Sequence, residues 1–235
     1  MTDAPIDDDD VEAEPVLERS LPPWWVLLLV AVAIAAVAFA IGRFSTFGIA
    51  GTTPGDGSPE AGFARDMQIH HAQAVDMAMT IHAKTDDEQL SALSYDIATA
   101  QSAQRGEMFD WLVRWGLPQL GEPMTWMAAS SVEHAHGGAA ADETEPMTDE
   151  QMREAMGMAS EAELAALRAA SGQDADCLFL SLMIRHHEGA IPMVDAVLEL
   201  GSEERALTVA ESMKNAQLFE IDAMTAMQER LGCSG

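Results

Sequence analysis

The sequence is poor in positive charge. It has 12 Lys and Arg residues against 39 Asp and Glu, which gives a formal net charge of -27, and its lysines are limited to Lys84 and Lys214. Without a basic patch the chain cannot neutralise a row of phosphates, so nucleic acid is excluded as an expected partner. A diffuse acidic surface is typical of a soluble protein and does not by itself indicate a binding site.

Cysteine is also scarce, with Cys177 and Cys233 alone. Two cysteines are too few for a disulfide scaffold, and they lack the CxxC spacing of zinc and redox sites. Cys177 opens one expected helix and Cys233 follows the antiparallel one, so the two can pair only if the C-terminal tail folds back. A disulfide and two separate thiols both remain open.

The N-terminal region divides into three segments. Residues 1–21 are acidic and almost without apolar side chains, which predicts a disordered acidic tail. The uncharged run WWVLLLVAVAIAAVAFAI follows and predicts a transmembrane helix over 22–42, near the lower length limit for ~30 Å of hydrocarbon. Residues 43–58 are rich in Gly, Thr and Pro and predict a linker. A cleaved signal peptide is the alternative, which the acidic start disfavours.

An internal repeat dominates the rest of the chain. The segment FARDMQIHHAQAVDMAM begins at Phe63, and FLSLMIRHHEGAIPMVD begins 116 residues later at Phe179. A second correspondence, at a slightly shorter offset, aligns Gln104, Glu107 and Met108 with Gln217, Glu220 and Ile221. A repeated segment of this kind is typical of a duplicated structural unit.

Each copy predicts a helical hairpin. The expected helices cover about 62–83, 86–116, 175–200 and 203–231, within hairpin one (59–116) and hairpin two (174–231). Helix-start signals support them: Ser58 before Pro59, a capping box from Thr85 to Glu88, and Gly201-Ser202 followed by two glutamates. We therefore expect an all-α fold, an antiparallel four-helix bundle formed by residues 59–235.

A methionine-rich insert over 117–173 separates the hairpins. Capping boxes at Thr148–Gln151 and Ser160–Glu163 predict two short helices, and 130–146 is expected to be loop. The insert either forms a secondary metal site or packs as ordinary amphipathic chain, and both readings stay open. Its candidate residues are Met124, Trp126, Met127, His134, His136, Met147, Met152, Met156 and Met158.

Histidine and methionine recur on one face of each hairpin. Helical spacing places Met67, His70, Ala74 and Met77 on one inward stripe, and Met183, His186, Ala190 and Met193 on its repeat, with His71 and His187 beside them. Pseudo-twofold symmetry brings both stripes to the bundle axis, where Gln104, Glu107, Gln217 and Glu220 are expected to face them. The alternative for Glu107 and Glu220 is a simple pairing with Arg or with these histidines.

These side chains predict a soft-metal site. Thioethers favour Cu(I) and imidazole accepts either oxidation state of copper, whereas Mg²⁺ and Ca²⁺ require oxygen cages. A methionine stripe alone is more often core packing, and a single buried histidine is more often hydrogen-bonded than ligating. Four imidazoles near one axis, however, are costly to bury without a shared purpose.

The motifs MQIHHAQAVDMA and MIRHHEGAIPM, separated by a Met-bearing insert, resemble those of the domain-of-unknown-function family 305 over roughly 58–231. The resemblance implies a ferritin-like bundle outside the cytoplasm and, from some family members, copper binding. It assigns the metal site to Met67, His70, His71, Met77, Met183, His186, His187 and Met193. Pro192 departs from a symmetric pattern, because it removes an N–H inside the third long helix.

We therefore predict a copper-binding or buffering protein that is not an enzyme, anchored on the outer face of the plasma membrane, with Glu107 and Glu220 as further metal-site candidates. One alternative is a ferritin-like oxidase using His70, His186, Glu107 and Glu220 around two metals, although the Glu-x-x-His pairs of di-iron bundles are missing. Another is a metal-free bundle that serves as a scaffold.

Overall fold

The computed structural model of this chain describes residues 23–47, 53–130 and 148–233. Every regular element in these residues is helical, and they contain no strand. The expected all-α class is confirmed for them. The chain divides into two compact units, Met1–Gly51 and Thr52–Gly235, which are described separately.

The first unit contains one helix, α1 (Trp24–Phe47). It continues past Gly42, so the first residues of the expected linker are helical. No helix in the described part of the chain is both long and apolar enough to cross a membrane. The transmembrane prediction, made for a run at the short limit of membrane-spanning length, is therefore not supported, although a helix forms there. The expected acidic tail at 1–21 lies outside the described residues.

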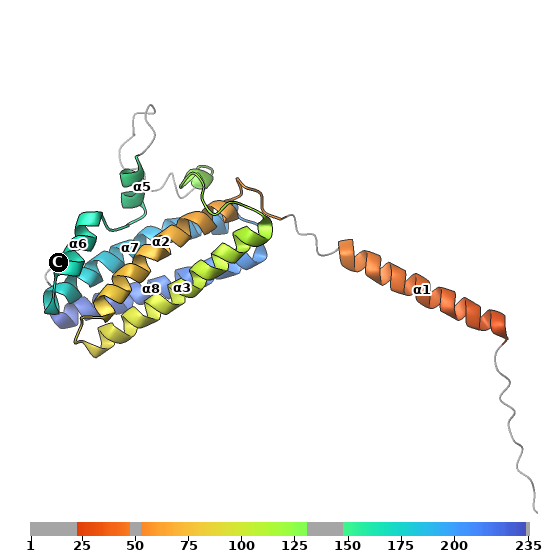
Figure 1. The fold of residues 1–235 in the computed structure, drawn as a ribbon, viewed down its shortest axis with the longest axis horizontal. Coiled ribbons are helices and arrows are strands. Elements are labelled where there is room, and N and C mark those ends of the chain that lie inside the picture. The colour runs from red at the N-terminus through yellow and green to blue at the C-terminus, as the bar shows by residue number, and fades with distance from the viewer. Residues whose placement is uncertain (1–22, 48–52, 131–147, 234–235) are drawn as a thin grey trace, which may run out of the picture. The chain divides into compact units, whose positions relative to one another are not determined.

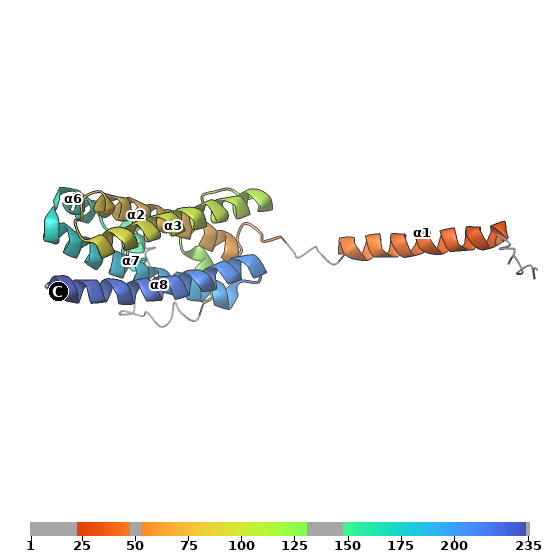
Figure 2. The ribbon, with the colours of Figure 1, turned by 90° about the horizontal axis from the view of Figure 1, so that it is seen from below.

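Four long helices make up the body of the second unit: α2 (Pro59–His82), α3 (Glu88–Trp115), α7 (Gly172–Leu200) and α8 (Glu204–Leu231). Figures 1 and 2 show them side by side as two hairpins, α2–α3 and α7–α8. The bounds agree with the expected helices to within three residues. α7 continues without a break through Pro192.

Contacts at the helix ends show that the two hairpins pack antiparallel. Glu60, at the start of α2, accepts hydrogen bonds from the backbone N–H of Ser202 and Glu203 after the end of α7. Arg205, at the start of α8, pairs with Glu107 near the end of α3. At the opposite end of the bundle, a second ion pair joins α8 to the start of α3.

The helix caps differ in part from those expected. The Ser58 cap is confirmed, since its hydroxyl accepts the Ala61 N–H at 3.2 Å. The predicted capping box at Thr85–Glu88 is wrong: α3 starts at Glu88, and Asp87 caps it by accepting the Leu90 N–H at 2.9 Å. Glu203 likewise caps α8 in place of Ser202. A carboxylate next to the helix start reaches the free N–H groups directly.

The cysteines form the disulfide Cys177–Cys233, with 5.4 Å between their Cα atoms. The chain turns back after α8 at Gly232, whose φ of 67° is left-handed, and this turn brings Cys233 to the first turns of α7. The disulfide alternative is thus the one observed.

The insert contains a short 3₁₀ helix, η1 (Thr125–Met127), and two helices, α5 (Asp149–Ala155) and α6 (Glu161–Ala169). Of these, η1 and α6 pack against α2 and α7. Both of its expected capping boxes are confirmed. Met127, Met156 and Met158 are buried in the main core, which supports the packing role for this part. His134, His136 and Met147 lie outside the described residues.

Candidate metal centre

Both His–Met stripes face the interior, as their spacing predicts. None of their members is more than 1% exposed: Met67, His70, Ala74, Met77, Met183, His186, Ala190 and Met193. His71 and His187 are fully buried as well. The two stripes meet because α2 and α7 pack against each other antiparallel.

The four imidazoles lie together but do not converge on one point. The rings of His70 and His186 touch across the α2–α7 seam, with 3.6 Å between their centroids. The centroid of each lies more than 6 Å from that of the histidine next to it in sequence, 6.4 Å to His71 and 6.2 Å to His187. Consecutive helical residues point about 100° apart, so His71 turns to α3 and His187 to α8.

Hydrogen bonds fix one nitrogen on three of the four rings. The Nε2 of His70 donates to the carbonyl oxygen of Met156 at 2.9 Å. The Nε2 of His71 donates to Gln104 Oε1 at 2.7 Å, and that of His187 to Glu220 Oε2 at 2.6 Å. With Nε2 protonated, a neutral imidazole keeps a lone pair on Nδ1.

The remaining ring nitrogens are buried and have no partner. These are the Nδ1 atoms of all four rings and the Nε2 of His186. Buried polar atoms are normally hydrogen-bonded, and each exception needs an explanation. A histidine that ligates a metal through one ring nitrogen usually donates the N–H of the other to a hydrogen-bond acceptor, which orients the ring. His70, His71 and His187 have this arrangement, with Nε2 bonded and Nδ1 free to ligate.

Burial also keeps three of these rings, those of His70, His71 and His186, neutral. It lowers the pKa of His70 to about 4 and that of His71 to about 3, and it lowers the pKa of His186 well below its ordinary value. Desolvation is the largest cause in each case, and charge on the neighbouring imidazoles adds to it. The bare nitrogens of these three rings are therefore available as ligands at neutral pH.

The four candidate methionines flank the histidines in two pairs. Met67 lies one turn before His70 on α2, and Met193 two turns after His186 on the antiparallel α7, so both belong to the same apolar cluster. Met77 and Met183 share the cluster on the other side. Each side of the histidine layer thus offers thioether sulfur to a soft ion.

The two candidate glutamates have different surroundings. Glu220 contacts His187 and its side chain is 16% exposed. Glu107 instead pairs with Arg205 at the surface, and its side chain is 29% exposed. Glu107 therefore does not face the histidines, because the guanidinium on the adjacent helix satisfies its carboxylate, and of the two alternatives for Glu107 the pairing with Arg is the one observed.

The structure also corrects the alignment of the repeat. His71–Gln104 and His187–Glu220 are equivalent contacts, and both span 33 residues. The offset of 116 residues thus holds throughout, and Gln104 corresponds to Glu220. Gln217 then corresponds to Gln101, which the shorter offset leaves out. Both side chains are buried with an unpartnered Oε1. Applying the offset of 116 residues to Gln217 identifies Gln101 from the sequence alone.

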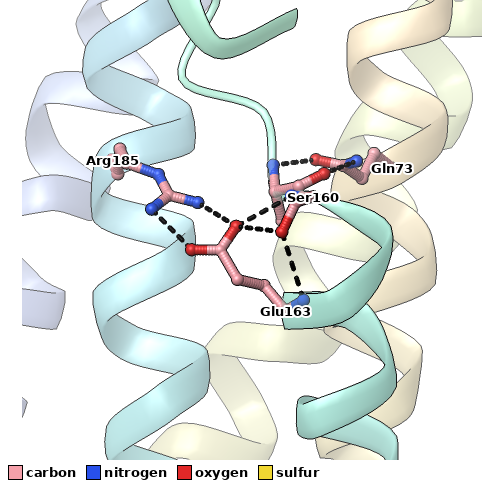
Figure 3. A network of polar contacts seen from close by, with 5 residues as sticks. Gln73, Ser160, Glu163 and Arg185 are labelled. Carbon is pink, nitrogen blue, oxygen red and sulfur yellow. Dashed lines mark hydrogen bonds and ion pairs between the residues drawn. The ribbon is translucent and has the colours of Figure 1, made fainter. Parts of the chain in front are cut away.

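A second contribution that the sequence did not reveal comes from the insert. The Met156 carbonyl that holds His70 lies against Gly189, where a Cβ would collide with it. Gln73 fixes the next turn by bonding both the N–H and the carbonyl of Ala159. Figure 3 shows the two hydrogen bonds of Gln73 beside a second network, in which Ser160 and Arg185 both bind the Glu163 carboxylate. The insert is therefore anchored to α2 and α7 beside the histidines.

The donor set fits a soft metal ion in part. Bare imidazole nitrogens and flanking thioethers are copper ligands, and the orphaned nitrogens supply the lone pairs. Within the described ranges, however, no three His, Cys, Asp or Glu side chains are grouped closely enough to hold a metal ion. A bound ion would have to combine imidazole with thioether, or draw the rings together.

Comparison with known proteins places the chain in a family. The family model described as "Domain of unknown function (DUF305)" matches residues 60–228. The chain belongs to the DUF305 family. No curated protein matches it. The matched residues run from the first turn of α2 to the last turn of α8, so the DUF305 match includes both hairpins and the insert.

Solved structures share the fold of this DUF305 chain. A putative secreted DUF305 protein from Streptomyces coelicolor is 34% identical, with a TM-score of 0.64 over 77% of this chain and 96% of that one. A DUF305 fragment from Deinococcus radiodurans is 31% identical, with a TM-score of 0.58 over 73% and 96%. CopM in its Cu(I)-bound form is 20% identical, with a TM-score of 0.52 over 74% and 96%; at that identity the likeness shows the fold alone.

Proposed function

We propose that this DUF305 protein binds and buffers copper through the paired histidines and methionines of its two hairpins, and that it is not an enzyme. The observation that carries the proposal is the set of buried, unpartnered Nδ1 atoms on His70, His71, His186 and His187. Three of these rings are held from behind by an acceptor, which orients a ligand before the metal arrives. The structures of CopM with Cu(I) and with Cu(II) support copper as the metal.

The methionines complete the proposed site. Met67 and Met193 lie on one side of the histidine layer, and Met77 and Met183 on the other. Thioether favours Cu(I), while imidazole holds either oxidation state. In this proposal copper is bound cargo and catalyses no reaction. The four-helix body would bind the ion and exclude water from it.

An extracytoplasmic location is part of the proposal. The Cys177–Cys233 disulfide supports it, because disulfides form and persist in oxidising compartments. The Streptomyces coelicolor relative is described as a putative secreted protein. A DUF305 domain outside the cytoplasm would meet copper before it reaches the cell interior.

A Cu(I) titration of the full chain against a colorimetric chelator tests the proposal. The paired variants His70→Gln/His186→Gln and His71→Gln/His187→Gln should each lose at least about 100-fold in affinity, since removal of outer partners alone costs 10–100-fold. His82→Gln is the matched control, because His82 is also on α2 but binds Ser91 near the surface. Glu107→Gln should leave the affinity unchanged.

Thermal unfolding of each variant, followed by circular dichroism, shows whether the bundle is retained. Wild-type affinity in both paired variants would remove the proposed site. Turnover of Fe(II) with oxygen by the wild-type chain would favour an oxidase instead. Of the two candidate glutamates, however, only Glu220 lies beside a histidine, while Glu107 pairs with Arg205.

A further inference from the structure

The two halves of the candidate site have the same geometry but different charges. On α3, Gln104 accepts the Nε2–H of His71, and on α8, Glu220 accepts that of His187. The two acceptors occupy equivalent positions, 116 residues apart. One is a neutral amide and the other a carboxylate, so the hydrogen bond is conserved between the halves while the charge is not.

The residues next to these acceptors increase the difference. Arg105 follows Gln104, and its guanidinium lies near enough to disfavour positive charge on His71. The equivalent of Arg105 in the second hairpin is Ile221, which carries no charge. The His71 half thus has a neutral acceptor followed by a positive side chain, whereas the acceptor of the His187 half is itself a carboxylate and is followed by an uncharged residue.

The Glu220 carboxylate is placed to act at short range. Its side chain is 16% exposed and its partner ring is fully buried. Solvent screens such a charge much less than one on the open surface. The interaction energy between a fixed charge and an ion is proportional to the charge of the ion, so a carboxylate stabilises a divalent ion about twice as much as a monovalent one.

We propose that Glu220, acting through His187, is the residue by which this protein distinguishes Cu(II) from Cu(I). Glu220 is a positioning and charge-compensating residue in this role and is not a metal ligand. The proposal rests on the copper-binding function proposed above. Gln104, with Arg105 beside it, makes the first half-site the one better suited to Cu(I).

The test uses the full chain and two reciprocal variants. Glu220→Gln keeps an amide acceptor for His187, as Gln104 does for His71, and removes only the charge. Its affinity for Cu(II) should fall about tenfold more than its affinity for Cu(I), measured with a competing chelator for each ion. A tenfold change in that ratio raises the Cu(II)/Cu(I) potential by about 59 mV.

Gln104→Glu should change the ratio in the opposite direction and favour Cu(II). Glu188→Gln is the matched control: Glu188 also neighbours His187 in sequence, but it is exposed, so loss of its charge should leave the ratio unchanged. Melting curves of all three variants identify any loss of fold, and the opposite signs expected for the reciprocal variants cannot arise from unfolding.

Two outcomes would overturn the proposal, and they are distinguishable. If Glu220→Gln weakens both copper ions equally, or neither, Glu220 is only a hydrogen-bond acceptor, and the copper-binding function stands. If the wild-type chain binds neither ion, the copper function itself fails and the proposal fails with it.

Discussion

Hairpin one and hairpin two have the same frame, meaning two antiparallel helices of which the second has equivalent bounds and caps, but they contact different parts of the chain. Asp87 and Glu203 cap equivalent helix starts, and Gly116 and Gly232 end the same helices in the left-handed conformation. Both pairs are 116 residues apart. The hairpins differ where they meet the disulfide, the insert and the candidate metal. The frame repeats because local capping patterns and helical periodicity determine it. The differences arise where the two hairpins contact different residues elsewhere in the chain.

The disulfide is the largest difference, since it ties down hairpin two alone. Cys177 and Cys233 correspond to Ala61 and Leu117 in hairpin one. The bond closes a loop of 56 residues, for which loop entropy predicts about 4 kcal/mol of stability. Replacing both cysteines by alanine should lower the free energy of unfolding in urea by that amount.

Addition of reductant provides the control for this prediction. It should destabilise the wild-type chain and leave the cysteine-free variant unchanged. Equal stability of the oxidised and reduced wild-type chain would mean that hairpin two needs no covalent closure.

The buried histidines give the second effect, which is a loss of stability in acid. The folded pKa of His70, about 4, lies below the ordinary value of 6.5. The unfolded chain therefore takes up the proton first, and stability is lost as the pH falls from about 6.5 towards 4. For His70 alone the loss reaches about 3 kcal/mol.

Urea unfolding of the metal-free chain and of His70→Gln, at several pH values between 7.5 and 4, measures this effect. The difference between them isolates the imidazole, because the acidic residues are common to both. His186→Gln should show a difference of the same sign. A difference in unfolding free energy that does not change with pH would contradict the burial of His70.

The Glu163–Arg185 pair acts at lower pH. Because Arg185 lowers the pKa of Glu163 to about 2, the stability that this pair contributes is present above a pH of about 4.5 and is lost only below it.

The contact between the insert and hairpin two gives the smallest of the three effects. Gly189 corresponds to Gln73, and the two positions hold the insert by different means, a close backbone approach and a side-chain amide. Gly189→Ala should cost about 2 kcal/mol, because the Met156 carbonyl and the backbone at Gly157 must shift. It should also weaken copper binding by displacing the acceptor of His70.

Gly106→Ala is the matched control for Gly189→Ala. A Cβ at this α3 position meets nothing within 4 Å, so the change should stabilise the helix by about 0.5–1 kcal/mol. Chemical denaturation compares the two variants directly. Similar stabilities would show that the insert does not pack against α7 as closely as the structure indicates.

The sequence was sufficient to predict most of the four-helix frame and which histidines and methionines face its interior. The repeat and its helical period predicted the four long helices and the inward stripes, and the confirmed caps at Ser58, Thr148 and Ser160 are local patterns. The wrong caps at Thr85 and Ser202 are errors of one or two residues, because several adjacent side chains can each cap a helix. The membrane span predicted over 22–42 is not supported.

By itself, then, the sequence determined which side chains are inside, because helical periodicity and duplication are properties of neighbouring residues. Only the tertiary structure decided what those side chains meet. Glu107 binds Arg205, Glu220 binds His187, and the Met156 carbonyl holds His70. These contacts join residues 33 to 98 positions apart, and no local pattern specifies them. The packing of α2 against α7 and the anchoring of the insert bring these groups to the same place.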